Sequence, residues 1–518
     1  MKTPLAASML CLFCLCSAWS AGARSGRVVL LHEGPDAFAV RHSLAGSAKT
    51  SLDLQYYIWE GDLTGSTLLQ SVLDAADRGV KVRLLLDDAT SSGLVGGLTG
   101  LVGRYARGAV DQAGDRAADL GLAGRRTELR RLARDLRSGG RDTVAAALDS
   151  HPNIEVRIFN PFRARGLGGG LRALELAGSF SRLNRRMHNK IFLADRGAAV
   201  TGGRNISDRY FGYDEDYNYG DLDVLVEGPA ASAIADSFDQ YWESPRAVPV
   251  RRFWLDRNPR VNLAALRAEL AGFIASLPDR PDPRESARTH AALRARAARA
   301  QVEVVSDDPR KPDLPSRKVA EAIEARLASA GNDVLVESGF FVPTRAEYPS
   351  LEAALKRGVR VRVLTNSVAS NDVFPAAVGY KRHRKRLLLL GADLREARPS
   401  GGSARTAGRG GGTSGLHTKA AVFDRRSAFI GTFNLDPRSA SLNTEIALFL
   451  TGGNLPAQLA ARIEKNSASA WRARLDNRRR LVWSGKPGEA DIRIEPETGP
   501  GKRLKLSIFS ALPLDPLL

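Results

Sequence analysis

Residues Arg185–Asn205 read RRMHNKIFLADRGAAVTGGRN, and residues Ser414–Asn434 read SGLHTKAAVFDRRSAFIGTFN. Both stretches contain H-x-K, four residues, D, six residues and then G-[GT]-x-N. A single copy of such a triple has little weight, but two copies at identical spacing indicate duplication of one unit. The chain is therefore predicted to consist of two related halves.

A strand-helix-strand pattern precedes each motif. SLDLQYYIWEGDLTGSTLLQSVLDAADRGVKVRLLLDD begins at Ser51, and NDVLVESGFFVPTRAEYPSLEAALKRGVRVRVLTNS begins at Asn332. Apolar strand runs separated by a helical period are typical of βαβ units, and they predict a largely parallel sheet covered by helices. Each half thus has its own α/β unit and its own motif.

The polar residues of the motif are spaced to share one face. His188 and Lys190 are two residues apart, as are His417 and Lys419, and alternate residues of a strand point to the same side. An imidazole, an ammonium group and a nearby asparagine make a poor metal site but suit a phosphate diester. Displacement at phosphorus needs both a nucleophile and an acid, and two facing halves supply one histidine for each task.

Composition agrees with a large globular protein that binds polyanions. The 518 residues are too many for one ordinary core, and the contents of 43% hydrophobic and 26% charged residues are those of a folded chain. The formal net charge of +19 indicates a polyanionic partner, which is nucleic acid, an anionic membrane surface or a phosphate-bearing substrate.

The N-terminus has the pattern of a secretory signal. MKTPLAASMLCLFCLCSAWSAGARSG contains the basic Lys2, an apolar run from Leu5 to Trp19 and the small residues Ala21 and Ala23. We expect cleavage after Ala23. All three cysteines lie in this segment, so the mature chain would have neither a disulfide nor a cysteine-ligated metal.

The duplicated motif resembles the phospholipase D superfamily. The flanking sequences LNRRMHNK, GDLDVLVEG and FDQYWES in the first half, and VVSDDP, GLHTK and GTFNLDPRSASLNTE in the second, are similar to the bacterial cardiolipin synthase C-type branch. The resemblance covers almost the whole mature chain apart from an insert after about Thr90. It implies an α/β fold with two pseudo-symmetric phospholipase D-like domains, whose mixed sheets are covered by helices and which pack around a shared active site.

Domain boundaries are predicted as follows: a signal peptide at 1–23, a first domain at 24–255 with its motif at 182–209 and an insert at about 90–140, a linker with a helix at 256–300, a second domain at 301–485 with its motif at 411–438, and a C-terminal extension at 486–518. The insert has two interpretations. It is either a tolerated surface insertion or a flap over the site.

The resemblance also implies roles for the motif residues. The implied catalytic residues are His188, Lys190, Asp195, His417, Lys419 and Asp424. His188 is expected to become a covalent phosphohistidine. His417 is expected to protonate the departing alcohol and then to deprotonate the incoming one. The two lysines are expected to stabilise charge on the phosphoryl oxygens.

A second group of residues is expected to support the site. This group comprises Asn205, Asn434, Thr432, Glu445 and Asp223. The asparagines are expected to hold phosphoryl oxygens, and the two carboxylates are each expected to orient a histidine. Thr432 retains a hydroxyl where the superfamily commonly has serine, whereas the matching residue of the first half, Gly203, has none. The aspartates of the two motifs are expected to support the motif rather than to react.

The implied function is phosphatidyl transfer between anionic phospholipids, which makes cardiolipin. Two alternatives remain open: hydrolysis that releases phosphatidic acid, and nuclease activity or nucleic-acid binding, which the presence of both motifs in one chain disfavours. We expect no cofactor and no metal. The expected partners are anionic phospholipids and the membrane surface, after export to the periplasm with or without a retained leader as an anchor. The sequence does not indicate an oligomeric state.

Overall fold

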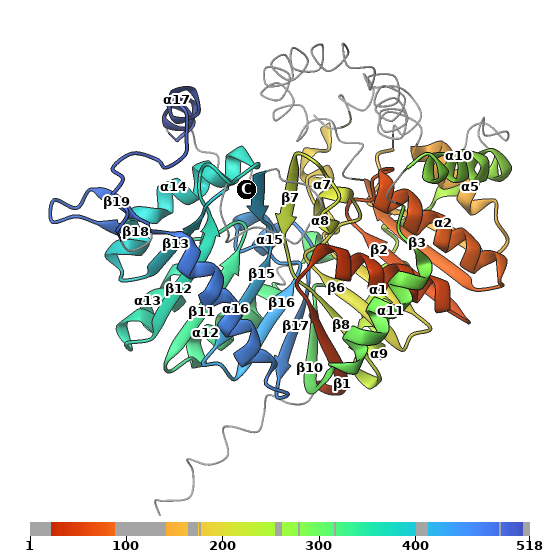
Figure 1. Ribbon diagram of the computed structural model, residues 1–518, viewed down its shortest axis with the longest axis horizontal. Coiled ribbons are helices and arrows are strands. Elements are labelled where there is room, and N and C mark those ends of the chain that lie inside the picture. Colours follow the sequence, from red (N-terminus) through yellow and green to blue (C-terminus); the bar gives the residue numbers. More distant parts are fainter. Residues whose placement is uncertain are drawn as a thin grey trace, which may run out of the picture.

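The computed structural model describes residues 22–88, 141–163, 175, 178–253, 262–277, 280–314, 317–399, 413–485 and 488–510 (Figure 1). The predicted insert at about 90–140 and residues 1–21 of the predicted signal peptide lie outside these ranges. Among the residues described, no helix is long and apolar enough to span a bilayer.

The first half of the chain contains strands and helices in alternation. Its strands are β1 (Arg24–Leu31), β2 (Ser51–Tyr56), β3 (Lys81–Asp87), β4 (Ile154–Phe159), β5 (Ile191–Ala194), β6 (Ala198–Gly202), β7 (Tyr217–Gly220), β8 (Asp223–Glu227) and β9 (Ala247–Pro249). Its helices are α1 (Gly34–Ser47), α2 (Leu63–Asp77), α5 (Arg141–Asp149), α7 (Phe180–Leu183), α8 (Asp208–Phe211) and α9 (Pro229–Trp242), followed by the 3-10 turn η3 (Val250–Phe253).

Two helices, α10 (Leu263–Ala275) and α11 (Pro283–Ala295), follow in the region predicted to be a linker. They pack on the first half, α10 against α2 and α11 against α1. Nδ1 of His42 in α1, for example, lies 2.9 Å from the hydroxyl oxygen of Ser286 in α11. This stretch therefore covers the first half as an additional helical layer.

The second half repeats the plan. Its strands are β10 (Ala298–Ser306), β11 (Asp333–Ser338), β12 (Arg360–Asn366), β13 (Asp393–Ala397), β14 (Thr413–Leu416), β15 (Lys419–Phe423), β16 (Ser427–Gly431), β17 (Ile446–Thr451), β18 (Trp471–Leu475) and β19 (Leu481–Ser484). Its helices are the 3-10 turn η4 (Lys311–Asp313), α12 (Lys318–Ser329), α13 (Tyr348–Lys356), α14 (Phe374–Leu389), α15 (Pro437–Ser441), α16 (Leu455–Ser469) and α17 (Pro500–Phe509).

Seventeen of these strands form one sheet that runs through both halves (Figure 1). The hydrogen-bonded pairs give the spatial order β9-β4-β3-β2-β5-β6-β8-β1-β10-β17-β16-β15-β11-β12-β13-β18-β19. The first strands of the two halves, β1 and β10, pair antiparallel at the centre, and the order on one side of them mirrors the order on the other. The pseudo-symmetry predicted from the repeat is confirmed, and the halves are joined by a continuous sheet.

Within the large sheet, parallel pairing is confined to two trios of strands. β2, β3 and β4 run parallel, as do β11, β12 and β13, and these are the strands of the predicted βαβ units. The other pairs of the large sheet are antiparallel, because the motif strands and those after them are joined by short hairpins rather than by crossover helices. The expectation of a largely parallel sheet is therefore wrong, and the sheet is mixed.

Both faces of the sheet are buried. In β8, Val224 and Val226 pack in a core with α9, whereas Leu225 packs in a separate core with α1 and α2. Alternate residues of a strand point to opposite faces, so a strand with consecutive apolar residues, as at positions 224–226, requires helices on both sides. The core beside α9 also receives side chains from α16 and thus continues across both halves.

Candidate active site

His188 lies just before β5 in the first half, and a carboxylate of the second half holds its ring. Nδ1 of His188 lies 2.9 Å from Oε2 and 3.1 Å from Oε1 of Glu445. The backbone N–H of His188 donates to the carbonyl oxygen of Thr444 over 2.9 Å. The hydroxyls of Thr432 and Ser439 also donate to Glu445, over 2.5 and 2.8 Å. Because Nδ1 faces an ionised carboxylate, it has the hydrogen, and Nε2 keeps its lone pair.

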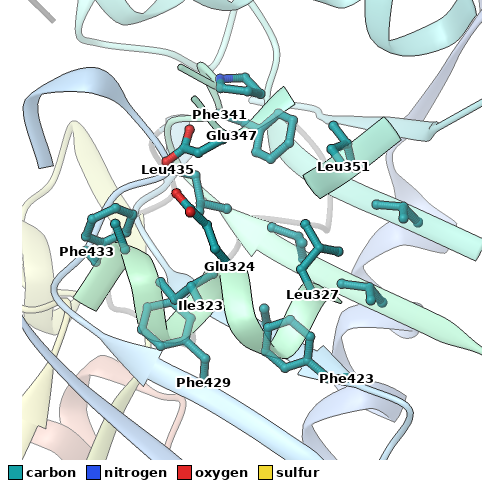
Figure 2. A pocket seen from close by; sticks show the side chains of 16 residues that line it. Ile323, Glu324, Leu327, Phe341, Glu347, Leu351, Phe423, Phe429, Phe433 and Leu435 are labelled. Carbon is teal, nitrogen blue, oxygen red and sulfur yellow. The ribbon is translucent and has the colours of Figure 1, made fainter. Parts of the chain in front are cut away.

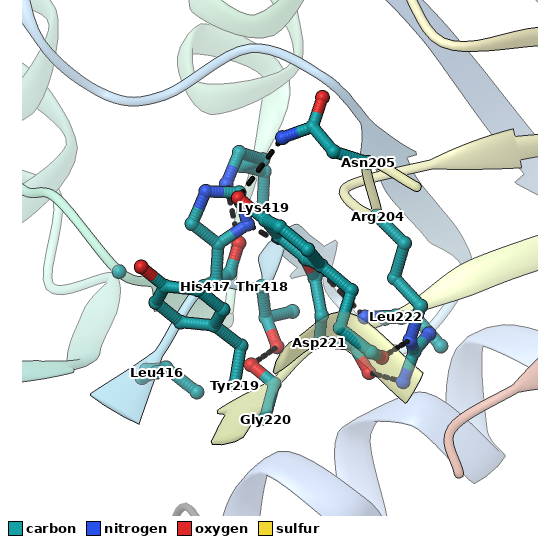
Figure 3. A network of polar contacts seen from close by, with 12 residues as sticks. Arg204, Asn205, Tyr219, Gly220, Asp221, Leu222, Leu416, His417, Thr418 and Lys419 are labelled. Atoms are coloured by element: carbon teal, nitrogen blue, oxygen red, sulfur yellow. Dashed lines mark hydrogen bonds and ion pairs between the residues drawn. The ribbon is translucent and has the colours of Figure 1, made fainter. Parts of the chain in front are cut away.

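His417 has the reciprocal arrangement. Its Nδ1 lies 2.6 Å from Oδ2 of Asp221, and its backbone N–H donates to the carbonyl oxygen of Gly220 over 2.7 Å. Figure 3 shows His417 and Lys419 of the second half beside Tyr219, Gly220 and Asp221 of the first. The neighbouring strands β7 and β14 pair in parallel across the two halves, which places these residues next to one another.

The histidine–carboxylate pairs therefore cross between the halves. His188 of the first half is paired with Glu445 of the second, and His417 of the second half is paired with Asp221 of the first. Both carboxylates are fully buried, so each imidazole has a fixed orientation and a fixed tautomer. Neither half alone contains a complete histidine pair.

The two lysines lie next to the histidines and are almost completely buried. Nζ of Lys190 donates to the carbonyl oxygen of His188 over 2.7 Å. Nζ of Lys419 donates to the carbonyl oxygen of His417 and lies 3.0 Å from its Nδ1. Burial, and then the charge of Lys419, lower the pKa of Lys190 to about 7, while Glu445 opposes the shift. Burial likewise lowers the pKa of Lys419.

Both histidines are neutral in the free site. Burial is the largest cause that lowers the pKa of His188, to about 4, and the charges of Lys190 and Lys419 contribute. Burial and the charge of Lys419 lower the pKa of His417 to about 3, and Lys190 contributes there too. Each lysine thus acts on the histidine of the other half, so the two motifs form one electrostatic site. A neutral imidazole with a free Nε2 is a competent nucleophile.

The two asparagines differ in their contacts. Oδ1 of Asn205 accepts the backbone N–H of Ile58 over 3.2 Å, and its Nδ2 donates to the hydroxyl of Tyr210 over 2.9 Å. Oδ1 of Asn434 is buried and has no hydrogen-bond partner among the described residues. A buried side-chain oxygen without a partner at a motif position is typical of a position that awaits a ligand or a water.

A steric clash explains why position 203 is a glycine. A Cβ atom at Gly203 would lie 2.0 Å from Oδ1 of Asp221, whereas the matching Thr432 has room to donate to Glu445. The first half therefore needs glycine where the second half tolerates a hydroxyl side chain. This explains why the sequence departs from the common pattern of the superfamily at this residue.

The motif aspartates lie away from the histidines, at the opposite end of each motif strand. Oδ1 of Asp195 accepts backbone N–H groups from residues 49–51, over 2.7 to 3.1 Å. The carboxylate of Asp424 accepts those of residues 331–333, over 2.7 to 3.0 Å. Both aspartates have positive φ, about 50°, in the hairpin turn after the strand, which an aspartate tolerates better than most residues. Their assignment as catalytic residues is therefore corrected: they bind the backbone at the start of β2 and of β11, the strands that pair with the motif strands β5 and β15.

Asp223 was expected to orient a histidine, and this prediction is wrong. Its carboxylate accepts from Nη2 of Arg41 over 2.8 Å and from the backbone N–H of Arg204 over 3.1 Å, and it is fully buried. The carboxylate that faces His417 is Asp221, two residues earlier. The sequence does contain a signal for Asp221. A glycine follows the equivalent strands β8 and β17, at Gly228 and Gly452. The residues seven positions before these glycines are Asp221 and Glu445.

Aromatic rings contact both histidines and were not among the predicted site residues. The ring of Tyr57 meets His188 edge-on at 5.1 Å between centroids. The rings of Tyr210 and Tyr219 each lie 5.1 Å from that of His417, and Phe340 lies 6.2 Å from it. These rings limit water around the imidazoles, and such spacing has no local sequence signature.

The described part of the chain contains no group of three or more histidine, cysteine, aspartate or glutamate side chains arranged to hold a metal ion. The site consists of histidines paired with carboxylates and of lysines that face them. Such a donor set suits binding of an anion by hydrogen bonds and charge.

Comparisons with known proteins agree with this arrangement. Residues 42–242 and 323–471 match the family model described as cardiolipin synthase, PLD-like domain. Cardiolipin synthase C of Escherichia coli is 35% identical over 94% of this chain and 95% of its own length. Cardiolipin synthase A of Pectobacterium carotovorum is 24% identical over 85% of this chain and 68% of its own length. The crystal structure of a phosphatidylserine synthase from Haemophilus influenzae superposes on this chain with a TM-score of 0.54 at 15% sequence identity. The superposition covers 95% of this chain and 94% of the synthase, which shows a shared fold.

Proposed function

The chain belongs to the cardiolipin synthase family of phospholipase D-like proteins, as its two motifs predicted, and we propose that it transfers a phosphatidyl group between anionic phospholipids to make cardiolipin. The observation that carries the proposal is the crossed pair of carboxylate-held histidines next to two buried lysines. This arrangement supplies two imidazoles to one phosphate.

In the first step, Nε2 of His188 attacks the phosphorus of a phosphatidylglycerol-type donor. The new N–P bond forms as the bond from phosphorus to the glycerol oxygen breaks, and His417 gives its proton to that oxygen. Glu445 accepts the hydrogen bond from Nδ1 and stabilises the positive charge that develops on His188. Asp221 does the same for His417 when that ring has a second proton.

In the second step, His417 takes a proton from the hydroxyl of a second lipid, whose oxygen attacks phosphorus and releases His188. Lys190 and Lys419 neutralise the phosphoryl oxygens in both steps, and the amides of Asn205 and Asn434 donate hydrogen bonds to them. The anionic diester also offsets the charge of the lysines, which makes protonation of His417 easier in the complex than in the free site.

Hydrolysis shares the first step and differs only in the acceptor, since water would replace the lipid alcohol. The rings of Tyr57, Tyr210 and Tyr219 around the imidazoles favour transfer, because they reduce the access of water to the phosphoryl group. Nucleic-acid cleavage remains the alternative from a different class, and the net charge of +19 permits it.

The test is lipid analysis with purified protein and phosphatidylglycerol vesicles. We expect cardiolipin and free glycerol as products, unchanged when a metal chelator is present. Phosphatidic acid without cardiolipin would show hydrolysis instead, and cleavage of DNA at moderate salt without lipid turnover would show a nuclease. Expression in a host that lacks cardiolipin enzymes should restore cardiolipin, and His188→Ala should not.

Association with the membrane surface after export is part of the proposal. The outer face of α17 presents Leu504 and Ile508, whose exposed fractions are 64% and 57%, with Lys505 beside them. Leu506, on the opposite face, is fully buried and anchors the helix to the protein. An apolar stripe next to cations suits the interface of an anionic bilayer.

Flotation with anionic vesicles tests this contact. Leu504→Asp combined with Ile508→Asp should reduce vesicle binding several-fold, because it removes apolar area and adds negative charge. Ile494→Asp is the matched control, since Ile494 is similarly exposed at 60% but lies outside the helix. Equal loss of binding in both variants would argue against a role for α17.

A further inference from the structure

The residue five positions after each motif asparagine has a hydroxyl group, and the two hydroxyls differ in their contacts. Tyr210 of α8 occupies this position in the first half, and Ser439 of α15 occupies it in the second. The two positions correspond without a gap, because the histidine, lysine, aspartate and asparagine of the first motif all precede their counterparts by the same number of residues. Tyr210 and Ser439 are therefore alternatives at one structural place.

In the second half, the hydroxyl is engaged and the amide of the asparagine is open. The Ser439 hydroxyl donates to Oε1 of Glu445 over 2.8 Å and accepts the backbone N–H of Asn434 over 3.1 Å. Phe433 and Leu435, on either side of Asn434, lie among the apolar side chains beside α12 and α13, which fixes this segment (Figure 2). Oδ1 of Asn434 has no partner among the described residues, so its amide is the polar group left for a ligand.

In the first half, the amide is engaged and the hydroxyl is open. Oδ1 of Asn205 accepts the backbone N–H of Ile58 over 3.2 Å, which fixes the end of the amide that faces Tyr210. Nδ2 of Asn205 therefore donates to the hydroxyl oxygen of Tyr210 over 2.9 Å. Because that oxygen is the acceptor, the hydrogen of the hydroxyl is left over, and it has no acceptor within the part of the chain that the structure describes.

The Tyr210 hydroxyl lies within the candidate active site. The ring of Tyr210 meets that of His417 edge-on, and its hydroxyl contacts Asn205, a residue expected to hold a phosphoryl oxygen. Tyr210 is 7% exposed, as is His417, so the hydroxyl and the imidazole are equally enclosed. Burial raises the pKa of Tyr210 well above its usual value, while the hydrogen bond from Asn205 opposes the shift and the charge of Asp221 adds to it. The hydroxyl therefore stays protonated and can donate.

We propose that the hydroxyl of Tyr210 donates a hydrogen bond to a non-bridging oxygen of the reacting phosphate, which makes Tyr210 a further catalytic residue. This inference rests on the proposed function only in that the site accepts a phosphate diester. No proton is transferred, because the hydroxyl keeps its hydrogen throughout. A buried donor that is positioned in advance stabilises negative charge on the phosphoryl oxygens in the transition state. Tyr210 and Asn434 would thus bind these oxygens from different halves.

The test uses methyl 4-nitrophenyl phosphate, a soluble diester that requires neither a membrane nor an acceptor lipid. Tyr210→Phe removes only the hydroxyl and should lower kcat/KM at least about tenfold, because one donor to the phosphoryl oxygens is lost. Tyr348→Phe is the matched control and should change kcat/KM less than about twofold. Tyr348 is also buried, but its hydroxyl lies 2.6 Å from Nδ1 of His383, outside the site.

Sulfur substitution separates donation to the phosphate from a structural role of Tyr210. Replacing one or the other non-bridging oxygen of the diester by sulfur, which accepts hydrogen bonds poorly, gives two diastereomers. For one of them, the ratio of kcat/KM for the oxygen substrate to that for the sulfur substrate should be at least about fivefold smaller in Tyr210→Phe than in the unsubstituted protein. A structural role would lower kcat/KM for all three substrates alike.

Unchanged kcat/KM in folded Tyr210→Phe would overturn the proposal, as would an equal fall for the diester and both of its sulfur analogues. If Tyr210→Phe does not fold, Tyr210→Leu also lacks the hydroxyl and has the same expected effect. If the soluble diester is not turned over, the same variants are compared in cardiolipin formation from phosphatidylglycerol vesicles. Cardiolipin synthesis that Tyr210→Phe leaves unaffected refutes only this inference. The expected losses with the soluble diester, in a protein that makes no cardiolipin, refute only the proposed function.

Discussion

Nδ1 of His417 lies 2.6 Å from Oδ2 of Asp221, although 196 residues separate the two in the chain. The equivalent contact between His188 and Glu445 runs in the opposite direction, from the first half to the second. Because each half supplies the carboxylate for the histidine of the other, the site forms only when β7 and β14 are brought together. Catalytic competence is thus linked to docking of the halves.

Asp221→Asn should lower kcat about 10²- to 10⁴-fold, because the amide no longer stabilises a protonated His417. Asp223→Asn should instead lower the free energy of unfolding by about 3–5 kcal/mol, since Arg41 would be left as an uncompensated buried charge. Steady-state kinetics and urea denaturation of both variants separate the two roles. A larger loss of kcat in folded Asp223→Asn than in Asp221→Asn would contradict the assignment.

His188→Ala and His417→Ala should each reduce turnover by at least about 10³-fold, because each removes one end of the displacement. In the assigned order, His417→Ala retains the nucleophile and accumulates a phosphatidyl adduct on His188 when the donor has a good leaving group. Mass spectrometry of the quenched protein locates the adduct. An adduct on His417 in the His188→Ala protein would reverse the order.

Asp195→Asn should lower stability by about 1–3 kcal/mol and leave kcat within a few-fold, because its carboxylate binds only the backbone and hydroxyl of residues 49–51. Asp424→Asn is the matched variant in the second half and should behave in the same way. Both variants are checked by thermal unfolding and by measuring kcat well below the temperature at which they unfold. A selective loss of kcat without loss of stability would show that these aspartates take part in the reaction.

Gly203→Ala should lower activity strongly, since the added methyl group would lie 2.0 Å from Oδ1 of Asp221 and displace the carboxylate from His417. Gly46→Ala is the control. Its Cβ would meet no heavy atom within 4 Å, and in α1 an alanine should stabilise the helix by about 0.5–1 kcal/mol. The comparison uses kcat/KM and the midpoint of urea unfolding, and unchanged kcat/KM in Gly203→Ala would refute the steric explanation.

Stability should rise with pH between about 4 and 6.5. His188 and His417 have pKa values lowered to about 4 and about 3 in the folded protein, against 6.5 in the unfolded chain, mainly because of burial. Between these values the unfolded chain binds more protons, so falling pH favours unfolding. His188→Gln should reduce the slope of the free energy of unfolding against pH by up to about 1.4 kcal/mol per pH unit. Urea unfolding at several pH values between about 5 and 7 measures this slope. An identical slope in the variant would show that His188 is not buried in its neutral form.

Much of the fold follows from local patterns. The repeated strand-helix-strand pattern and the two motifs predicted two pseudo-symmetric α/β halves, and the paired strands confirm them. The sequence did not predict that β1 and β10 join the halves into one sheet, because antiparallel pairing of distant strands depends on register and not on local composition.

The sequence by itself identified the two histidine–lysine pairs that we propose bind the phosphate, His188 with Lys190 and His417 with Lys419, because the duplicated spacing predicts that each pair shares a face. Glu445 was expected from its position after the second motif, but the tertiary structure decided that Asp221, and not Asp223, meets His417. Asp221 and Asp223 are also two residues apart, and the spacing alone treats them as equivalent. The choice depends on where the chain leaves β7 for β8: Asp221 precedes the strand and faces the other half, whereas Asp223 begins it and is enclosed with Arg41.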